Sequence, residues 1–156
     1  MEKIKRIALV AHDTCKKDLV EWVEWNWQTL SQHHLVCTGT TGRLVEDALT
    51  RKQAEHKVMY PLNIVKLKSG PLGGDQQLGA MICEGKIDVV IFLWDPMNPQ
   101  PHDVDVKALL RIIVLYDVVT ATSRSTADFI ISSPLFSKEY HEKPRDFSSY
   151  INRKIN

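Results

Sequence analysis

The run Ser69-Gly-Pro-Leu-Gly-Gly-Asp75-Gln-Gln77 places one carboxylate among glycines, directly before a segment with helical spacing. Glycine lets the backbone approach a ligand closely and adopt positive φ, and a helix start offers unpaired N–H groups to an anion. An acid at such a position can act as a base on a phosphorylated substrate. The run also fits a tight strand-to-helix turn in which Asp75 is only the N-cap, so the loop alone leaves both interpretations open.

A second loop, Thr38-Gly39-Thr40-Thr41-Gly42, combines hydroxyl groups, flexible backbone and a helix start, which together suit a phosphate group. Lys16 could add a positive charge. The loop lacks the spacing and the lysine of a P-loop, and the chain contains no G-x-G-x-x-G, so a nucleotide or dinucleotide site is not indicated. A threonine-capped turn without a ligand remains the alternative.

Carboxylates and histidines complete the set of reactive candidates: Asp13, Asp75, Asp95, Asp105, His12 and His102. Mixed His and Asp side chains can bind a metal ion, but these lie on separate loops, so a metal site is the weaker interpretation. Carboxylates that lie close together raise one another's pKa values, which suits proton transfer near neutral pH. The sequence therefore favours acid–base chemistry. Taken singly, Asp105 could instead be a helix N-cap and His102 a surface-loop histidine.

Strand-like and helix-like segments alternate along the chain and must position these side chains. Such alternation implies parallel strands joined by right-handed crossovers, hence a doubly wound α/β domain: a flavodoxin-like three-layer sandwich with a five-stranded parallel sheet. Residues 52–62 and 95–101 are expected to be loops. Apolar runs predict strands at 7–11, 35–37, 64–67, 89–94 and 118–121, and helical spacing predicts helices at 16–30, 44–49, 76–83, 106–115, 126–131 and 146–154.

The order of these elements predicts where a ligand would bind. In an open α/β sheet, ligands bind beyond the carboxyl ends of the strands, and each reactive candidate follows such an end. We therefore expect the candidates to meet on one rim of the sheet. The tryptophans at positions 22, 25 and 27 are interpreted as core and subunit contacts rather than as part of this site.

Composition restricts the class of protein. With 156 residues and 44% hydrophobic side chains, the chain has the length of a single domain, residues 1–156. A net charge of +1 gives no basic field for nucleic acid, so a small ligand is expected. Three cysteines without C-x-x-C spacing indicate reduced thiols and a cytoplasmic protein. No apolar run suits a signal peptide or a membrane span, so neither export nor membrane insertion is expected.

Six motifs, taken together and in this order, resemble the methylglyoxal synthase family. The likeness extends over residues 7–131, and the related regulatory domain of carbamoyl phosphate synthetase, which shares the fold, lacks the set. Segment 43–68 looks longer than is usual in the family, and the tail, residues 146–156, matches only loosely. The motifs are Val10-Ala-His-Asp13, Thr38-Gly-Thr-Thr-Gly42, the Ser69 to Gln77 loop, Trp94-Asp-Pro96, Pro101-His-Asp103 and Ser125-Thr-Ala-Asp-Phe129.

The resemblance implies a homohexameric carbon–oxygen lyase. It would convert dihydroxyacetone phosphate to methylglyoxal and inorganic phosphate through an enediolate, with no metal or organic cofactor, and phosphate should inhibit it. A phosphate-sensing regulatory module of the same fold and a triose phosphate isomerase-like enzyme are the alternatives. Carried over by motif, the catalytic residues would be Asp75 as base with His12, His102 and Asp105, the phosphate contacts His12, Lys16, Thr38, Gly39, Thr40, Thr41, Ser69, Gly70 and His102, and the supporting network Asp13 and Asp95.

Overall fold

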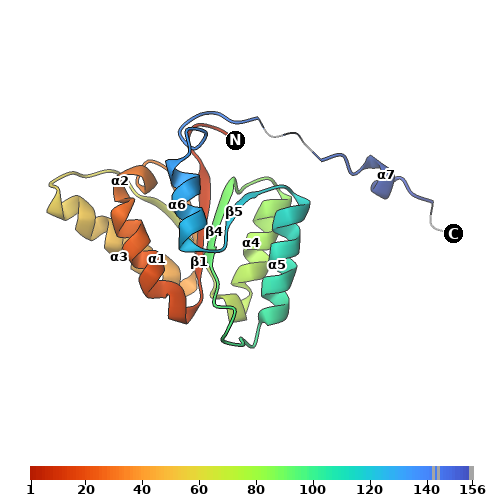
Figure 1. Cartoon of the computed structure of the whole chain (residues 1–156), viewed down its shortest axis with the longest axis horizontal. Helices are drawn as coiled ribbons and strands as arrows, with labels where there is room; N and C mark the ends of the chain where they lie inside the picture. The colour runs from red at the N-terminus through yellow and green to blue at the C-terminus, as the bar shows by residue number, and fades with distance from the viewer. Residues whose placement is uncertain (142, 144, 155–156) are drawn as a thin grey trace.

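A single parallel sheet forms the centre of the protein's computed structural model, which describes residues 1–141, 143 and 145–154. Its strands lie in the order β3-β2-β1-β4-β5 (Figure 1). All the strands predicted from the sequence form, so the expected five-stranded parallel sheet is confirmed. The strands are β1 (Arg6–Ala11), β2 (His34–Thr38), β3 (Asn63–Leu67), β4 (Val89–Leu93) and β5 (Val119–Ala121).

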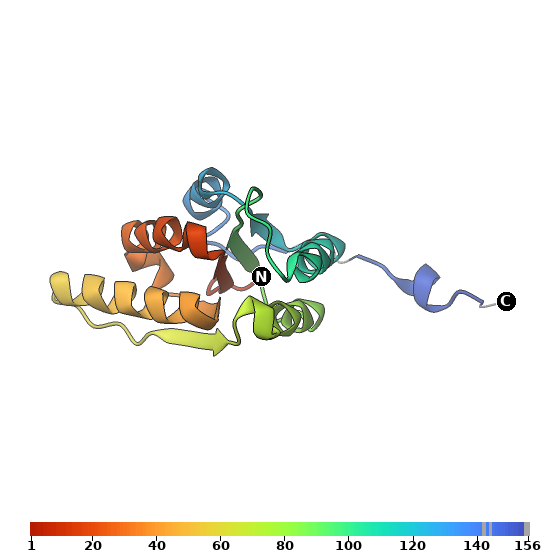
Figure 2. The ribbon, with the colours of Figure 1, turned by 90° about the horizontal axis from the view of Figure 1, so that it is seen from below.

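Helices cover both faces of this sheet, which gives the expected three layers (Figure 2). Alternate residues of a strand point to opposite faces, so Ile7 and Leu9 of β1 pack into one core while Ala8 and Val10 pack into the other. Side chains of α1, α3 and α6 close the first core, and side chains of α4 and α5 close the second. These helices are α1 (Lys16–Trp25), α3 (Gly39–Glu55), α4 (Gly74–Cys83), α5 (Asp103–Leu115) and α6 (Arg124–Ser132).

The direction of winding reverses between β1 and β4. The chain passes outward from β1 through β2 to β3 and then returns to β4, so the helices on the two sides of this point lie on opposite faces. Loops at the carboxyl ends of β1 and β4 therefore diverge and leave a crevice, the usual ligand site of such sheets. The strand order differs from the 2-1-3-4-5 order of flavodoxin itself, while the layers and the strand direction are as predicted.

Two predicted helices have different limits in the structure. The helix expected over 16–30 is interrupted at Asn26, whose side-chain amide donates to the carbonyl of Trp22, and the chain continues as α2 (Trp27–Leu30). The helix expected over 44–49 is α3, which extends well beyond it, so the prediction of a loop from residue 52 was wrong at its start. Gln53 is buried there, and its side-chain carbonyl oxygen accepts a hydrogen bond from the backbone N–H of Tyr60. This bond anchors the end of the helix.

The C-terminal segment leaves the body of the protein beyond Tyr140, whose backbone exchanges two hydrogen bonds with Met1 (Figure 1). The helix expected over 146–154 is only the single turn α7 (Ser148–Ile151). The predicted domain, residues 1–156, includes residues 142, 144, 155 and 156, which lie outside the described residues. Within the part of the chain that is described, no helix is both long enough and apolar enough to cross a membrane.

Candidate active site

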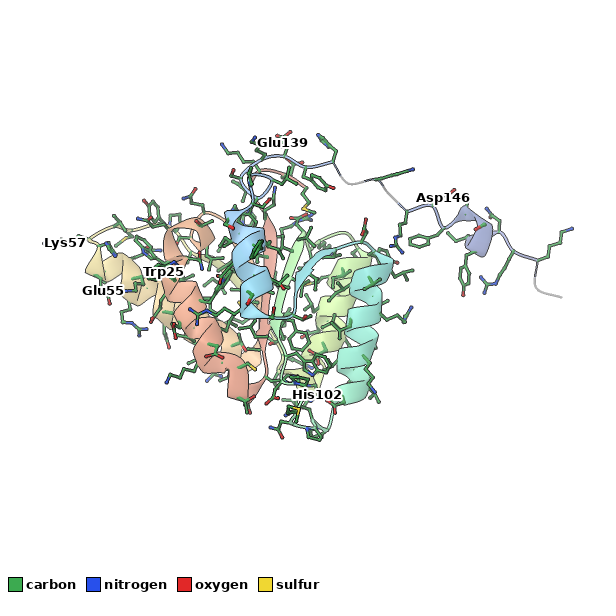
Figure 3. The ribbon with its side chains drawn as sticks, viewed as in Figure 1. Trp25, Glu55, Lys57, His102, Glu139 and Asp146 are labelled. Carbon is green, nitrogen blue, oxygen red and sulfur yellow. The ribbon has the colours of Figure 1, made fainter. Side chains whose placement is uncertain are left out.

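A cavity of about 250 Å3 opens at the carboxyl ends of the strands, where winding reverses. Figure 3 labels His102 at this end of the molecule. The predicted rim site is therefore a real concavity, although Gly39, Asp95 and Asp105 do not line it. The predicted residues that do line it are His12, Asp13, Lys16, Thr38, Thr40, Thr41, Ser69, Gly70, Asp75 and His102.

Asp75 is the most buried carboxylate of the cavity, with 3% of its surface exposed. It lies in the first turn of α4, and the N-cap of that helix is Gly73, which adopts a left-handed φ of 96°. The interpretation of Asp75 as a capping residue is therefore wrong. Its Oδ2 atom is buried and has no hydrogen-bond partner among the described residues. A buried carboxylate without a partner is costly, which is typical of a functional group rather than a structural one.

The surroundings of Asp75 make it a stronger base than an ordinary aspartate. Burial raises the pKa of Asp75, and the carboxylate of Asp105 adds to the rise, while His102 and His12 oppose it. Nε2 of His102 lies 3.7 Å from Asp75 Oδ2, which is close but longer than a hydrogen bond. Gly70 makes this approach possible, because a Cβ atom at position 70 would lie 2.8 Å from His102 Nε2 and 3.0 Å from Asp75 Oδ2.

Two histidine rings form the wall next to Asp75. His102 is the N-cap residue of α5, and only 11% of its side chain is exposed, so it is not a surface-loop histidine. His12 follows β1 and packs edge-on against His102, with ring centroids 5.8 Å apart. Burial lowers the pKa of His12, and the neighbouring His102 lowers it further. A neutral His12 donates a hydrogen bond from one ring nitrogen and accepts one at the other, and it adds no charge to the site.

The N-terminus of α3 also borders the cavity. Thr38 is its N-cap and makes no side-chain capping bond, so the first amides of the helix are not satisfied by the cap. Gly39 has a φ of +26° and packs directly on Ser69, since a Cβ atom there would lie 2.8 Å from Ser69 Cα. Lys16 lines the same side and forms an ion pair with Asp13. The start of a long helix, hydroxyl groups and a lysine together could bind an anion.

The predicted residues outside the cavity have identifiable positions. Asp105 lies in the first turn of α5 and acts on Asp75 through its charge, while the N-cap of that helix is His102, so the N-cap interpretation of Asp105 is also wrong. Asp95 accepts a hydrogen bond from the Thr14 hydroxyl at 2.7 Å, and its backbone N–H faces His12 Nδ1 at 3.4 Å. The described residues contain no group of three His, Cys, Asp or Glu side chains placed to hold one metal ion.

Comparison with known proteins agrees with this geometry. Residues 18–122 match the family model of the MGS-like domain. A methylglyoxal synthase of Maridesulfovibrio salexigens is 60% identical over 99% of this chain and 100% of its own length, and one of Proteus mirabilis is 50% identical over 97% and 92%. The crystal structure of methylglyoxal synthase from Elizabethkingia anophelis NUHP1 superposes with a TM-score of 0.87 at 46% identity, covering 100% of this chain and 95% of that one.

The chain belongs to the methylglyoxal synthase family.

Five further residues line the cavity that the sequence did not identify as site residues. Val10, Ala11 and Phe92 form an apolar floor at the ends of β1 and β4, and Pro71 and Gln100 complete the lining. These three residues could have been found from the sequence, because they lie near the ends of predicted strands, directly before the reactive loops. Gln100 lies in a proline-rich loop without regular periodicity, so no sequence signal placed it there.

The buried charge of Asp75 predicts that replacing it will stabilise the fold. The pKa of Asp75 in the folded state is raised above the ordinary 3.8, so its ionised form destabilises the fold at neutral pH. This cost disappears below pH 3.8, because the carboxyl group is then protonated in both the folded and the unfolded state. We expect the neutral, nearly isosteric Asp75→Asn to have a higher Tm than the wild type at pH 7. The difference should shrink as the pH falls, measured by thermal unfolding at a series of pH values.

A matched control is Asp47→Asn, which changes an exposed carboxylate in the middle of α3. Its Tm should stay close to that of the wild type at pH 7. A lower Tm for Asp75→Asn than for the wild type at pH 7 would mean that the ionised carboxylate is stabilised in the fold, contrary to the geometry described above.

Proposed function

We propose that this protein is a carbon–oxygen lyase that converts dihydroxyacetone phosphate to methylglyoxal and inorganic phosphate. Membership of the methylglyoxal synthase family supports this reaction. The observation that carries the proposal is that buried Asp75, whose Oδ2 has no hydrogen-bond partner among the described residues, lies beside His102 in a cavity that also contains a helix start suited to an anion. The first two groups suit proton transfer, and the third suits a phosphate group.

The reaction begins when Asp75 removes a proton from the hydroxymethyl carbon beside the ketone. The electron pair of the broken C–H bond forms the double bond of an enediolate, and negative charge develops on the former ketone oxygen. Burial supports this step, because a carboxylate with a raised pKa is a better base than a solvated one. The proton then resides on Asp75, next to the ring of His102.

His102 stabilises the enediolate and moves a proton between its two oxygens. Its Nε2 lies 3.7 Å from Asp75 Oδ2, so both atoms can reach the same part of a bound substrate. Neutral imidazole can hold a proton at either nitrogen. His12 borders the same space and offers a second ring. Donors fixed in a site with little water stabilise a developing oxyanion more effectively than water does.

Phosphate leaves when the enediolate electrons form a new double bond to the phosphate-bearing carbon and the C–O bond to phosphate breaks. The enol that remains tautomerises to methylglyoxal. The leaving group would be held by Lys16, the start of α3 at Thr40 and Thr41, and the Ser69 loop. Elimination requires the C–O bond to phosphate to lie out of the plane of the enediolate. The residues that hold the phosphate group therefore decide between elimination and isomerisation.

Two alternatives fit the site less well. A phosphate-sensing module needs the α3 start but has no use for a buried Asp75 or an adjacent His102, both of which are costly to keep. A triose phosphate isomerase-like enzyme would use the same base and anion site but retain the phosphate. The family resemblance favours elimination over isomerisation.

Release of inorganic phosphate from dihydroxyacetone phosphate distinguishes these activities. The wild-type protein should release phosphate and form methylglyoxal in equal amounts, and excess EDTA should not stop the reaction, since no proposed step uses a metal. A sensor would release none, and an isomerase would form glyceraldehyde 3-phosphate. Loss of activity with EDTA that a divalent ion restores would refute the metal-free mechanism.

The relative loss of activity in two variants tests the assignment of Asp75 as the base. Asp75→Asn should abolish turnover, because an amide is far too weak a base, while inhibition by phosphate stays near that of the wild type. His102→Gln should lose about 10²- to 10⁴-fold, the range of general acid–base help, because the base remains. If Asp75→Asn retains more activity than His102→Gln, with both variants folded, Asp75 is not the base.

Association into a cytoplasmic homohexamer is also part of the proposal. The family resemblance supports it, and so do large apolar side chains on the surface, such as Trp25 with 85% and Phe129 with 80% of their surface exposed. Size-exclusion chromatography with light scattering should give about six times the 17.8 kDa mass of one chain. A mass of one chain at micromolar concentration would contradict this expectation.

A further inference from the structure

The two histidines of the cavity differ in their hydrogen-bond partners. Nδ1 of His12 accepts the backbone N–H of Asp95 at 3.4 Å, whereas its Nε2 is buried without a partner among the described residues. Nδ1 of His102 is likewise buried without a described partner, and its Nε2 stands 3.7 Å from Asp75. One ring is therefore oriented by the backbone, and the other is not.

This difference fixes the position of a proton on His12. An imidazole nitrogen that accepts a hydrogen bond carries no proton, so a neutral His12 has its proton on Nε2. The lowered pKa of His12, caused by burial and by His102, keeps the ring neutral near pH 7. Since Nδ1 is occupied and the ring lines the cavity, the Nε2–H group is the one available to a ligand.

Asp95, whose backbone amide orients His12, is itself held through its side-chain carboxylate. The hydroxyl of Thr14 donates to Oδ2 of Asp95 at 2.7 Å, and the backbone N–H of Met97 donates to Oδ1 at 2.9 Å. Thr14 lies in the short 3-10 helix Asp13–Cys15, just after His12. Its bond to Asp95 thus ties the segment that follows β1 to the segment that follows β4.

We propose that Thr14 is a positioning residue that, through Asp95, keeps His12 in the Nε2–H tautomer. In this arrangement His12 is a fixed hydrogen-bond donor to an oxygen of the substrate, and His102 is the ring that exchanges protons. The assignment deepens the proposed function and rests on it. Thr14 does not line the cavity, so it acts through Asp95 and His12 rather than on the substrate.

The division of roles follows from what each ring can do. A donor whose direction is fixed before the reaction stabilises a developing oxyanion without reorganisation. A proton shuttle needs the opposite property, because it must give a proton from one nitrogen or take one at the other. Only His102 is close to the Asp75 carboxylate oxygen while both of its nitrogens lack a hydrogen bond to the described residues.

Three variants separate positioning from simple packing. Thr14→Val keeps the shape of the side chain but removes the hydroxyl that binds Asp95. Thr14→Ser keeps the hydroxyl and should restore most of the function. Thr50→Val makes the same chemical change at an exposed site on α3, far from the helix start, and serves as the control. Because Thr14 is exposed, none of the three should change Tm appreciably.

Nitrogen NMR of the imidazole rings reads the tautomer directly, with His12→Gln used to identify the His12 signals. Wild type, Thr14→Ser and Thr50→Val should show a protonated Nε2 and an unprotonated Nδ1 on His12. Thr14→Val should show a mixture of the two tautomers. This readout needs no catalysis, so it tests the positioning role even if the wild-type protein releases no phosphate from dihydroxyacetone phosphate, the result that refutes the proposed function.

Kinetics supply the second readout. Thr14→Val should lower kcat by about 10- to 100-fold, by analogy with the loss of groups that orient metal-bound histidines, while inhibition by inorganic phosphate stays unchanged. Thr14→Ser should recover most of the lost kcat, and Thr50→Val should match the wild type. The proposal is overturned if wild-type His12 carries its proton on Nδ1, or if Thr14→Val leaves both kcat and the His12 signals unchanged.

Discussion

Burial of the Asp75 carboxylate without a hydrogen-bond partner for Oδ2 is the constraint around which the rim of the sheet is built. The glycines before it make it possible: Gly73 adopts the left-handed turn, and a Cβ atom on Gly74 would lie only 2.0 Å from the carbonyl oxygen of Lys68. The end of β3 and the start of α4 therefore meet backbone against backbone. This close approach brings the carboxylate into the crevice and removes it from water, which is what raises its pKa.

The same reversal of winding that creates the crevice also brings unlike groups together in it. Loops from β1 and β4 supply the histidines, and loops from β2 and β3 supply the helix starts and the carboxylate. Groups suited to proton transfer and groups suited to anion binding thus border one small cavity. In the proposed reaction this arrangement holds the phosphate group in place while the chemistry takes place on the neighbouring carbon atoms.

The sequence predicted those features that depend on local pattern. Apolar runs located all the strands, and the rule that ligands bind at the carboxyl ends of parallel strands located the rim. Prediction from the sequence failed for the features that tertiary contacts determine. The length of α3 depends on Gln53, whose burial follows from distant residues such as Ser31, and Asp75 could not be separated from a capping residue until the turn at Gly73 was seen. Thr14 carries no motif, and only the crossing of two loops gives its hydroxyl a partner.

The central claim is that Asp75 is a base because it is buried, and its titration tests this most directly. The carboxyl carbon of Asp75 can be followed by NMR across the pH range in which the protein is folded, beside the pH dependence of kcat/KM for phosphate release. We expect Asp75 to titrate above the ordinary value of 3.8 and the acid limb of kcat/KM to have the same midpoint. Titration of Asp75 at or below 3.8, or full activity at a pH where Asp75 is protonated, would contradict this account.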